Sequence, residues 1–226
     1  HAPSHYLRSK GEGEGQYHLH GGASLRTTIV RPSVVFGPGD SLVNRFARLL
    51  KLTPFVFPLA CPDSRYAPVY VGDVVQAFAD STDDPHAAGE RFELCGPDEY
   101  TLREIVEYVR DVLGLRRRVI GLPPVLSRLQ GRIMQHLPGK PFTMDNYLSA
   151  SVPNVCNGAG ALERFVDYPT PMEAVVPTYL VRQGSRWRYR EYRRMPRMRH
   201  TAIDYRGRHS GDDMDRGAGG GTRRAY

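Results

Sequence analysis

Short runs of β-branched and aromatic residues alternate with amphipathic runs along this chain of 226 residues. The apolar runs have the length of buried strands and occur at 25–30, 65–71, 91–96 and 117–123. Runs with helical spacing occur at 4–17, 41–52, 74–81, 100–114, 124–137, 143–152 and 172–180. This alternation predicts an α/β fold with a largely parallel sheet, because helices connect one parallel strand to the next.

The run 100–114 has the most complete helix signals in the chain. Thr101 and Glu104 have the spacing of a capping box, in which each side chain accepts a backbone N–H of the first turn. Gly114 follows the last apolar position, where glycine adopts the left-handed conformation that ends many helices. Asp73 is predicted to be an N-cap as well, for the helical run that it precedes.

Charge divides the chain into two parts. Residues 1–181 hold 18 Lys and Arg against 19 Asp and Glu, whereas residues 182–226 hold 13 Arg, no Lys and five acidic residues. The second part has no apolar periodicity and is predicted to be a disordered or frame-shifted Arg/Gly-rich tail. Its arginines alternate with aromatic rings, which also suits single-stranded RNA, so RNA binding is an alternative. The first part is expected to be one partial domain without a specific nucleic-acid partner.

The cysteines are Cys61, Cys95 and Cys156, which are odd in number, far apart and outside any C-x-x-C motif. This predicts neither a disulfide framework nor a zinc site, and it favours a reducing compartment. Cys95 is expected to be a small buried apolar residue rather than a nucleophile. No apolar run has the roughly 18 residues that span a bilayer, and residues 1–20 lack the apolar core of a signal peptide. The expected location is cytoplasmic, with a peripheral position at the inner membrane as the alternative.

The stretch HYLRSKGEGEG, residues 5–15, has two interpretations. Its glycines form G-x-G-x-G rather than G-x-G-x-x-G and do not follow a strand, so they do not predict a phosphate-binding loop. Tyr6 and Lys10 are four residues apart and share one face of a helix. An ammonium beside a phenol favours the phenolate, which can exchange a proton with a substrate carbonyl or hydroxyl. On spacing alone, such a pair is also common on any helix.

Two other patterns have a structural and a functional interpretation. His18 and His20 could ligate a metal, but positions two apart face different sides of a helix and no acidic or cysteine partner follows, so no metal is predicted. The run PVLSRLQGRIMQHL, residues 124–137, is amphipathic with two arginines. It is predicted to be a lid helix over a substrate cleft, with a membrane surface or a protein partner as the alternatives.

Three blocks in the first part of the chain occur together in one known superfamily. They are YLRSK at 6–10, RPSVVFGPGD at 31–40 and VYVGDVVQAF at 69–78. In this order and at these spacings the chain resembles the extended short-chain dehydrogenases/reductases (SDRs), which include NAD-dependent epimerases and dehydratases. The stretches FELCGPDEYTLREIVEYV and FTMDNYLSASVPNVC are similar to an atypical branch that includes an accessory subunit of mitochondrial complex I. The resemblance extends over roughly residues 4–181.

The resemblance implies the carboxy-terminal part of a Rossmann-type doubly wound parallel sheet, with a small substrate and lid region. The superfamily's glycine-rich phosphate loop, and the serine or threonine that partners its tyrosine, should precede Tyr6 and are absent from this chain. Tyr6 would be the active-site phenol and Lys10 its partner on the cofactor ribose, so both are predicted to be catalytic and cofactor-binding. Pro32 and Ser33 would line the nicotinamide side.

The resemblance also implies a substrate side and a cofactor. Val34 and Phe36 are expected to lie toward the substrate. The implied cofactor is NAD(P)(H), and the implied activity is that of an oxidoreductase or epimerase acting on a carbonyl or carbinol of an unknown small molecule. The atypical branch adds an alternative, a non-catalytic accessory or assembly protein that holds the nucleotide in respiratory complex I or a quinone-linked system. Its partners would then be proteins of that complex or pathway.

Overall fold

The computed structural model describes residues 2–20, 27–156 and 160–180, and of residues 17–20 it describes the backbone alone. The predicted tail, 182–226, lies outside the described residues.

Strands and helices alternate along the described residues, as the sequence predicts. The strands are β1 (Ile29–Pro32), β2 (Val35–Phe36), β3 (Val56–Leu59), β4 (Arg65–Tyr66), β5 (Val69–Tyr70), β6 (Arg91–Leu94), β7 (Tyr100–Thr101) and β8 (Arg118–Gly121). The helices are α1 (His5–His20), α2 (Leu42–Leu52), α3 (Val71–Asp83), α4 (Leu102–Val112), α5 (Pro124–Met134), α6 (Met144–Ala150) and α7 (Met172–Leu180), with a 3₁₀ turn, η1, at Ala161–Arg164. The strands β2, β3 and β7 have no counterpart in the sequence prediction.

The strands pair in four separate two-stranded ladders. Three ladders are parallel, β1 with β6, β2 with β5 and β3 with β8, whereas β4 and β7 pair antiparallel. The predicted parallel pairing is therefore confirmed, but the sheet is divided into short pieces. Pro68 contributes to this division, because proline has no N–H for a ladder. Pro32 ends β1, Pro58 lies within β3, and Pro68 separates β4 from β5.

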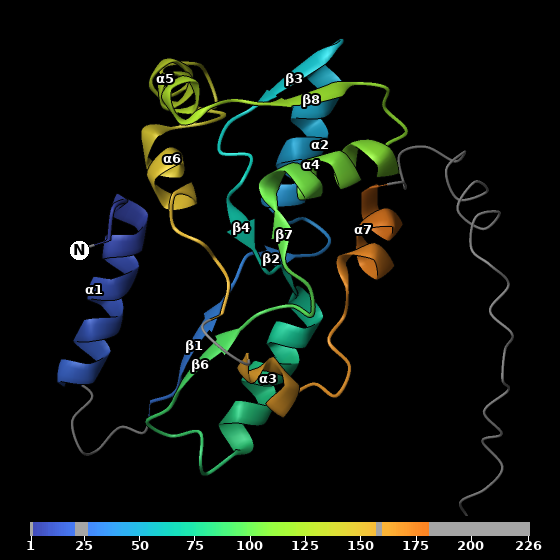
Figure 1. The fold of residues 1–226 in the computed structure, drawn as a ribbon. Helices are drawn as coiled ribbons and strands as arrows, with labels where there is room; N and C mark the ends of the chain where they lie inside the picture. Colours follow the sequence, from blue (N-terminus) through green and yellow to red (C-terminus); the bar gives the residue numbers. More distant parts are fainter. Residues whose placement is uncertain (1, 21–26, 157–159, 181–226) are drawn as a thin grey trace, which may run out of the picture.

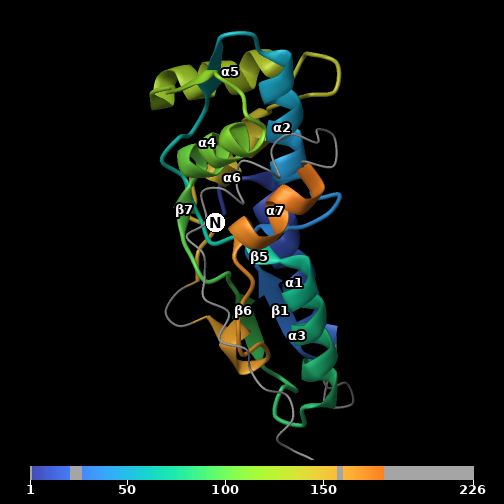
Figure 2. The same cartoon turned by 90° about the vertical axis from the view of Figure 1, so that its right-hand side faces the viewer.

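Apolar side chains form two cores, one toward each end of an elongated molecule (Figures 1 and 2). The first joins α2, β3, α4 and α7 and includes Val43, Leu50, Ile105, Val109 and Val176. The second joins β5, α3, β6 and η1 and includes Val69, Ala77, Leu94, Leu162 and Phe165. Full burial of one such side chain stabilises the fold by roughly 1.5–3 kcal/mol.

The helix ends confirm two sequence predictions and correct a third. Thr101 and Glu104 form the capping box of α4, and Gly114 has a φ of +67°, the left-handed conformation expected of it. Asp73, however, is not an N-cap, because α3 begins two residues before it and Tyr70 occupies the cap position. The buried Asp73 carboxylate instead accepts hydrogen bonds from the backbone N–H of Thr170 (2.7 Å) and its hydroxyl (3.0 Å). It therefore ties α3 to the segment that leads into α7.

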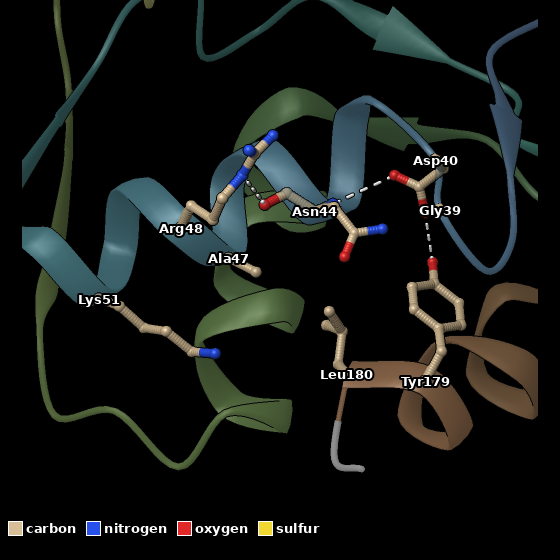
Figure 3. A pocket seen from close by; sticks show the side chains of 8 residues that line it. All are labelled: Gly39, Asp40, Asn44, Ala47, Arg48, Lys51, Tyr179 and Leu180. Carbon is tan, nitrogen blue, oxygen red and sulfur yellow. Dashed lines mark hydrogen bonds between the residues drawn. The ribbon is translucent and has the colours of Figure 1, made fainter. Parts of the chain in front are cut away.

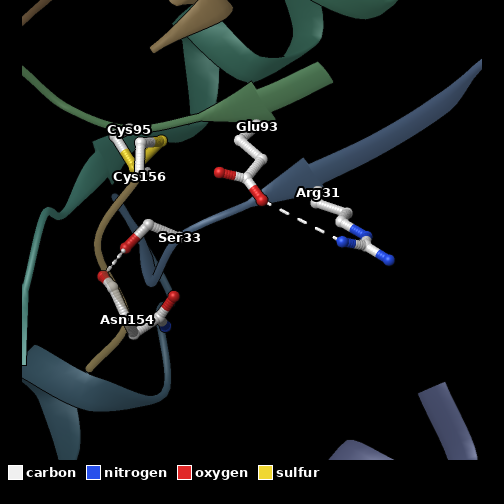
Figure 4. The surroundings of a disulfide bond; sticks show 6 residues. All are labelled: Arg31, Ser33, Glu93, Cys95, Asn154 and Cys156. Carbon is white, nitrogen blue, oxygen red and sulfur yellow. Dashed lines mark hydrogen bonds and ion pairs between the residues drawn. A yellow bond between two sulfur atoms is a disulfide. The ribbon is translucent and has the colours of Figure 1, made fainter. Parts of the chain in front are cut away.

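The prediction that the cysteines form no disulfide was wrong. Cys95 and Cys156 are bonded, so Cys95 is a cross-link between the end of β6 and the segment after α6 (Figure 4). The two are 61 residues apart in sequence. Backbone hydrogen bonds of Ala67, to Asn154 on one side and Gly96 on the other, bring their segments together, which spacing alone cannot show. Cys61 has a free thiol whose pKa is raised by burial.

Candidate functional site

Tyr6 and Lys10 lie on one flank of α1. The Lys10 ammonium is 5.9 Å from the centre of the Tyr6 ring, within the range of a cation–π contact. Both side chains are exposed, Tyr6 to 57%. The Tyr6 hydroxyl makes no hydrogen bond within the described part of the chain. The pair is therefore open to a ligand.

The start of α1 is fixed by two side chains. The Ser4 hydroxyl accepts the N–H of Leu7 (3.1 Å), which caps the first turn. The carboxylate of Asp145, on α6, accepts the N–H of His5 (2.6 Å) and that of Tyr6 (3.3 Å). Together they satisfy three amides that an isolated helix leaves without partners, and a carboxylate is favoured at this positive end of the helix dipole. Contact with α6 thus sets the position of the Tyr6 backbone.

The second half of α1 is attached to the β1–β6 ladder. Glu14 forms ion pairs with Arg31 on β1 (2.5 Å) and with Arg91 on β6 (2.6 Å). Figure 1 shows α1 running antiparallel to β1. Lys10 precedes Glu14 by one turn, about 6 Å along a helix. Ser33 follows Arg31 by about 7 Å along a strand. Lys10 and Tyr6 are therefore displaced toward the carboxyl end of β1.

The residues predicted for the nicotinamide and substrate sides have different surroundings. Pro32 is exposed at the end of β1. Ser33 is buried, where its N–H donates to the Leu94 carbonyl (2.8 Å) and its hydroxyl to the Asn154 carbonyl (2.7 Å; Figure 4). Val34 is half-buried, but Phe36 is 1% exposed and packs in the core. A substrate contact with Phe36 would require its neighbours to move.

The structure adds residues that sequence reasoning missed. Asp145, Asn154 and the Glu14 pairs act across long sequence distances, up to 140 residues for Asp145, so periodicity gives no sign of them. The His18 and His20 side chains lie outside the described residues. Among the described residues, the His, Cys, Asp and Glu side chains form no group of three suited to a metal ion.

A separate cavity of ≈ 320 Å³ lies between α2 and α7 (Figure 3). Its lining comprises Gly39, Asp40, Asn44, Ala47, Arg48, Lys51, Tyr179 and Leu180, and none of the predicted site residues. The Tyr179 hydroxyl donates to Asp40 (2.6 Å), and burial together with this carboxylate raises the pKa of Tyr179. Asp40 also accepts the N–H of Asn44, so it joins α7 to the start of α2.

Comparisons with known proteins bear on the family and the fold of the chain. Residues 13–86 match the 3-beta hydroxysteroid dehydrogenase/isomerase family. The chain is 31% identical over 177 residues to the mouse (Mus musculus) protein NADH dehydrogenase (ubiquinone) 1 alpha subcomplex subunit 9, mitochondrial. That similarity covers 74% of this chain and 44% of the mouse protein. The fold is similar to that of a nucleoside-diphosphate-sugar epimerase from Staphylococcus aureus, with a TM-score of 0.56 at 15% identity, over 76% of this chain and 58% of the epimerase.

The chain belongs to the short-chain dehydrogenase/reductase superfamily. The similarity to the mouse complex I subunit supports the predicted place on the extended, atypical branch. The chain is also 30% identical over 120 residues to a ceramide reductase from Caulobacter vibrioides, covering 53% of this chain and 37% of that protein. The SDR chain spans less than half the length of these curated relatives. Among its described residues, none of the helices combines the length and apolar character that a membrane crossing requires.

Proposed function

We propose that this SDR chain forms the nicotinamide side of an NAD(P)(H) site, in an oxidoreductase or epimerase that acts on a carbonyl or carbinol. One observation carries the proposal. Tyr6 and Lys10 share an open flank of α1 that lies toward the carboxyl end of β1. Ligands of open α/β sheets bind beyond the carboxyl ends of the parallel strands.

The residues on this flank suit the ribose and the nicotinamide ring. The exposed Lys10 ammonium has three donors for ribose hydroxyls. Pro32 presents an apolar ring surface at the end of β1, whereas the Ser33 N–H and hydroxyl are already engaged. Ser33 would therefore contribute by holding the turn in place. The Glu14 carboxylate, one turn after Lys10 on α1, is paired with Arg31 and Arg91, which offsets its charge beside an anionic cofactor.

The proposed chemistry assigns a proton to Tyr6. When bound, the nicotinamide would supply or accept a hydride. Tyr6 would give the proton of its hydroxyl to the substrate oxygen during reduction and take it back during oxidation. The Lys10 ammonium would stabilise the phenolate that remains. Acid–base catalysis by a positioned side chain contributes about 100- to 10,000-fold in rate.

The second candidate function is a non-catalytic one. The mouse relative is named as a subunit of NADH dehydrogenase. In a comparable role this chain would hold the dinucleotide through Lys10 without turnover, and its partners would be proteins of a respiratory or quinone-linked assembly. The ceramide reductase similarity supports the enzyme instead, because that relative is named for a reduction.

Titration calorimetry on the 226-residue chain tests the site, with NADH, NADPH and nicotinamide mononucleotide as ligands. The mononucleotide isolates the half of the cofactor that this flank would hold. Lys10→Ala should weaken its binding by about tenfold, the value of one charge-assisted hydrogen bond. Arg8→Ala is the matched control, because Arg8 is exposed on the same helix but two residues from Tyr6, on another face. Equal affinities for the Lys10→Ala and unmodified chains would contradict the proposal.

Tyr6→Phe separates the two functions. An enzyme should retain cofactor binding in this variant and lose turnover, because the ring is kept and the proton donor is lost. A nucleotide-holding accessory protein should show no turnover in either form.

A further inference from the structure

Helix α5 has its apolar stripe on the outside. Val125, Leu129 and Ile133 follow one another at intervals of four, so they form one stripe along the helix. Their exposed fractions are 78%, 49% and 58%. Ser127 and Gly131 form the opposite stripe, and these are the buried residues of α5. A surface helix ordinarily buries its apolar stripe and exposes its polar one.

Polar contacts, rather than apolar burial, hold α5 against the protein. The Ser127 hydroxyl accepts the N–H of Cys61 (3.1 Å) and donates to the carbonyl of Leu122 (3.1 Å). Gly131 faces Thr143, whose carbonyl oxygen would be 3.3 Å from a Cβ at this position, so glycine permits a close approach to α6. A lid closing over a cleft would turn its apolar side chains inward. The observed orientation leaves these side chains available to another partner.

Further exposed apolar side chains lie at this end of the molecule, on and beside the β3–β8 ladder. Figure 1 places α5, β3 and β8 at the same end of the molecule. Phe55, just before β3, is 80% exposed, and Leu52 at the end of α2 is 79% exposed. We define the α5 surface as the exposed large apolar side chains of this end: Leu52, Phe55, Val56, Ile120, Val125, Leu126, Leu129, Ile133 and Leu137.

The two segments that carry the α5 surface hold charges of one sign. Residues 41–62 and 112–144, which include every residue of the α5 surface, contain nine Lys and Arg and no Asp or Glu. The rest of residues 1–181 holds nine Lys and Arg against 19 Asp and Glu. Arg128 and Arg132 are exposed and border the apolar stripe on α5 itself.

We infer that the α5 surface docks on an anionic membrane, with α5 lying in the plane of the lipid headgroups. An interfacial helix has an apolar stripe that enters the acyl boundary and Lys or Arg beside it for lipid phosphates. Each Lys or Arg near an anionic leaflet adds attraction, and the exposed Arg128 and Arg132 supply such charge beside the stripe. This surface is separate from the Tyr6–Lys10 flank, so the inference does not depend on the proposed function.

Vesicle co-sedimentation of the 226-residue chain tests the inference. The vesicles are phosphatidylcholine alone or an equal mixture of phosphatidylcholine and phosphatidylglycerol. The chain should prefer the anionic vesicles. V125S/L129S/I133S should reduce this binding by about tenfold, because three apolar side chains no longer enter the lipid. The matched control is V75S/F78S/Y168S, which removes exposed apolar side chains elsewhere, and it should bind as the unmodified chain does.

Residues 182–226 carry a net positive charge and would add to the binding of every variant, so a second measurement reports on α5 alone. Trp187 is the single tryptophan of the chain. In a Trp187→Phe background, a tryptophan at Leu129 (L129W) should shift to shorter emission wavelength and be quenched by lipids brominated on their acyl chains. A tryptophan at Phe78 (F78W), on α3, should show neither change.

Three outcomes would overturn the inference. The first is equal vesicle binding by V125S/L129S/I133S and the unmodified chain. The second is unquenched L129W emission in a chain that still co-sediments, which would assign the attachment to charge elsewhere. The third is self-association of the unmodified chain in sedimentation velocity that V125S/L129S/I133S abolishes without vesicles, which would assign the α5 surface to a second copy of the chain.

Discussion

Helices α4 and α5 have the same length, 11 residues, and both are amphipathic. However, α4 turns its apolar side chains toward the protein interior, whereas α5 turns them toward the outside. In α4 the buried positions are Leu102, Ile105, Val106, Val109 and Val112, which pack in the first core. In α5 the buried positions are Ser127 and Gly131, and the apolar side chains are outside.

The difference shows that an amphipathic pattern predicts a helix better than it predicts which side the protein covers. Burial of its apolar stripe fixes α4, and hydrogen bonds with a close backbone approach fix α5. Helix α4 thus contributes to folding stability, whereas α5 keeps its apolar surface for an interaction.

The largest difference between the two helices should appear in the free energy of unfolding when one apolar side chain is truncated in each. Ile105→Ala in α4 should lower the free energy of unfolding by about 3 kcal/mol, because it opens a cavity in a closed core. Leu129→Ala in α5 should change it by less than about 0.5 kcal/mol. Urea denaturation of both variants measures the difference. If Leu129→Ala were as costly as Ile105→Ala, the outer stripe of α5 would be buried in solution and the comparison would fail.

A smaller effect should come from the polar attachment of α5. Ser127→Ala leaves the N–H of Cys61 and the carbonyl of Leu122 without this partner, which should cost about 1–2 kcal/mol. Ser41→Ala is the control, since Ser41 is exposed and makes no capping hydrogen bond to α2. Chemical denaturation with equal losses for both serines would show that hydrogen bonding does not hold α5.

Local signals in the sequence were enough for much of the fold. The capping box at Thr101 and Glu104, the glycine at 114 and the proline that opens α5 each act within a few residues, so the bounds of α4 and α5 could be predicted closely. The same signals misplaced Asp73, whose partner, Thr170, lies 97 residues away. They also missed the Cys95–Cys156 disulfide, which depends on how separate ladders meet.

In the candidate site, too, local sequence signals predict some features and miss the contacts between distant residues. Spacing placed Tyr6 and Lys10 on one flank of a helix, and the structure shows them so. Their catalytic and cofactor roles stay predictions. Sequence could not show that Asp145 holds the first turn of α1 or that Ser33 is engaged by Asn154, because chain crossings far along the sequence create these contacts.

The smallest effect should come from the N-terminal cap, a side-chain carboxylate that α4 has and α5 lacks. Glu104 accepts the N–H of Thr101 (2.7 Å) and its hydroxyl (2.8 Å), and the backbone bond first, then the hydroxyl, lowers the pKa of Glu104. A carboxyl group with a lowered pKa stabilises the fold above its unfolded pKa and loses this effect as pH falls through the folded value. Helix α5 begins at Pro124, and its N-cap residue, Pro123, provides no side-chain hydrogen bond. Glu104→Gln should therefore lower the melting temperature slightly at pH 7, and the difference should shrink between about pH 5 and pH 3.

Glu163→Gln, at another exposed glutamate, should show no such change, and a constant Glu104→Gln deficit across this range would exclude the ionised capping box as its cause.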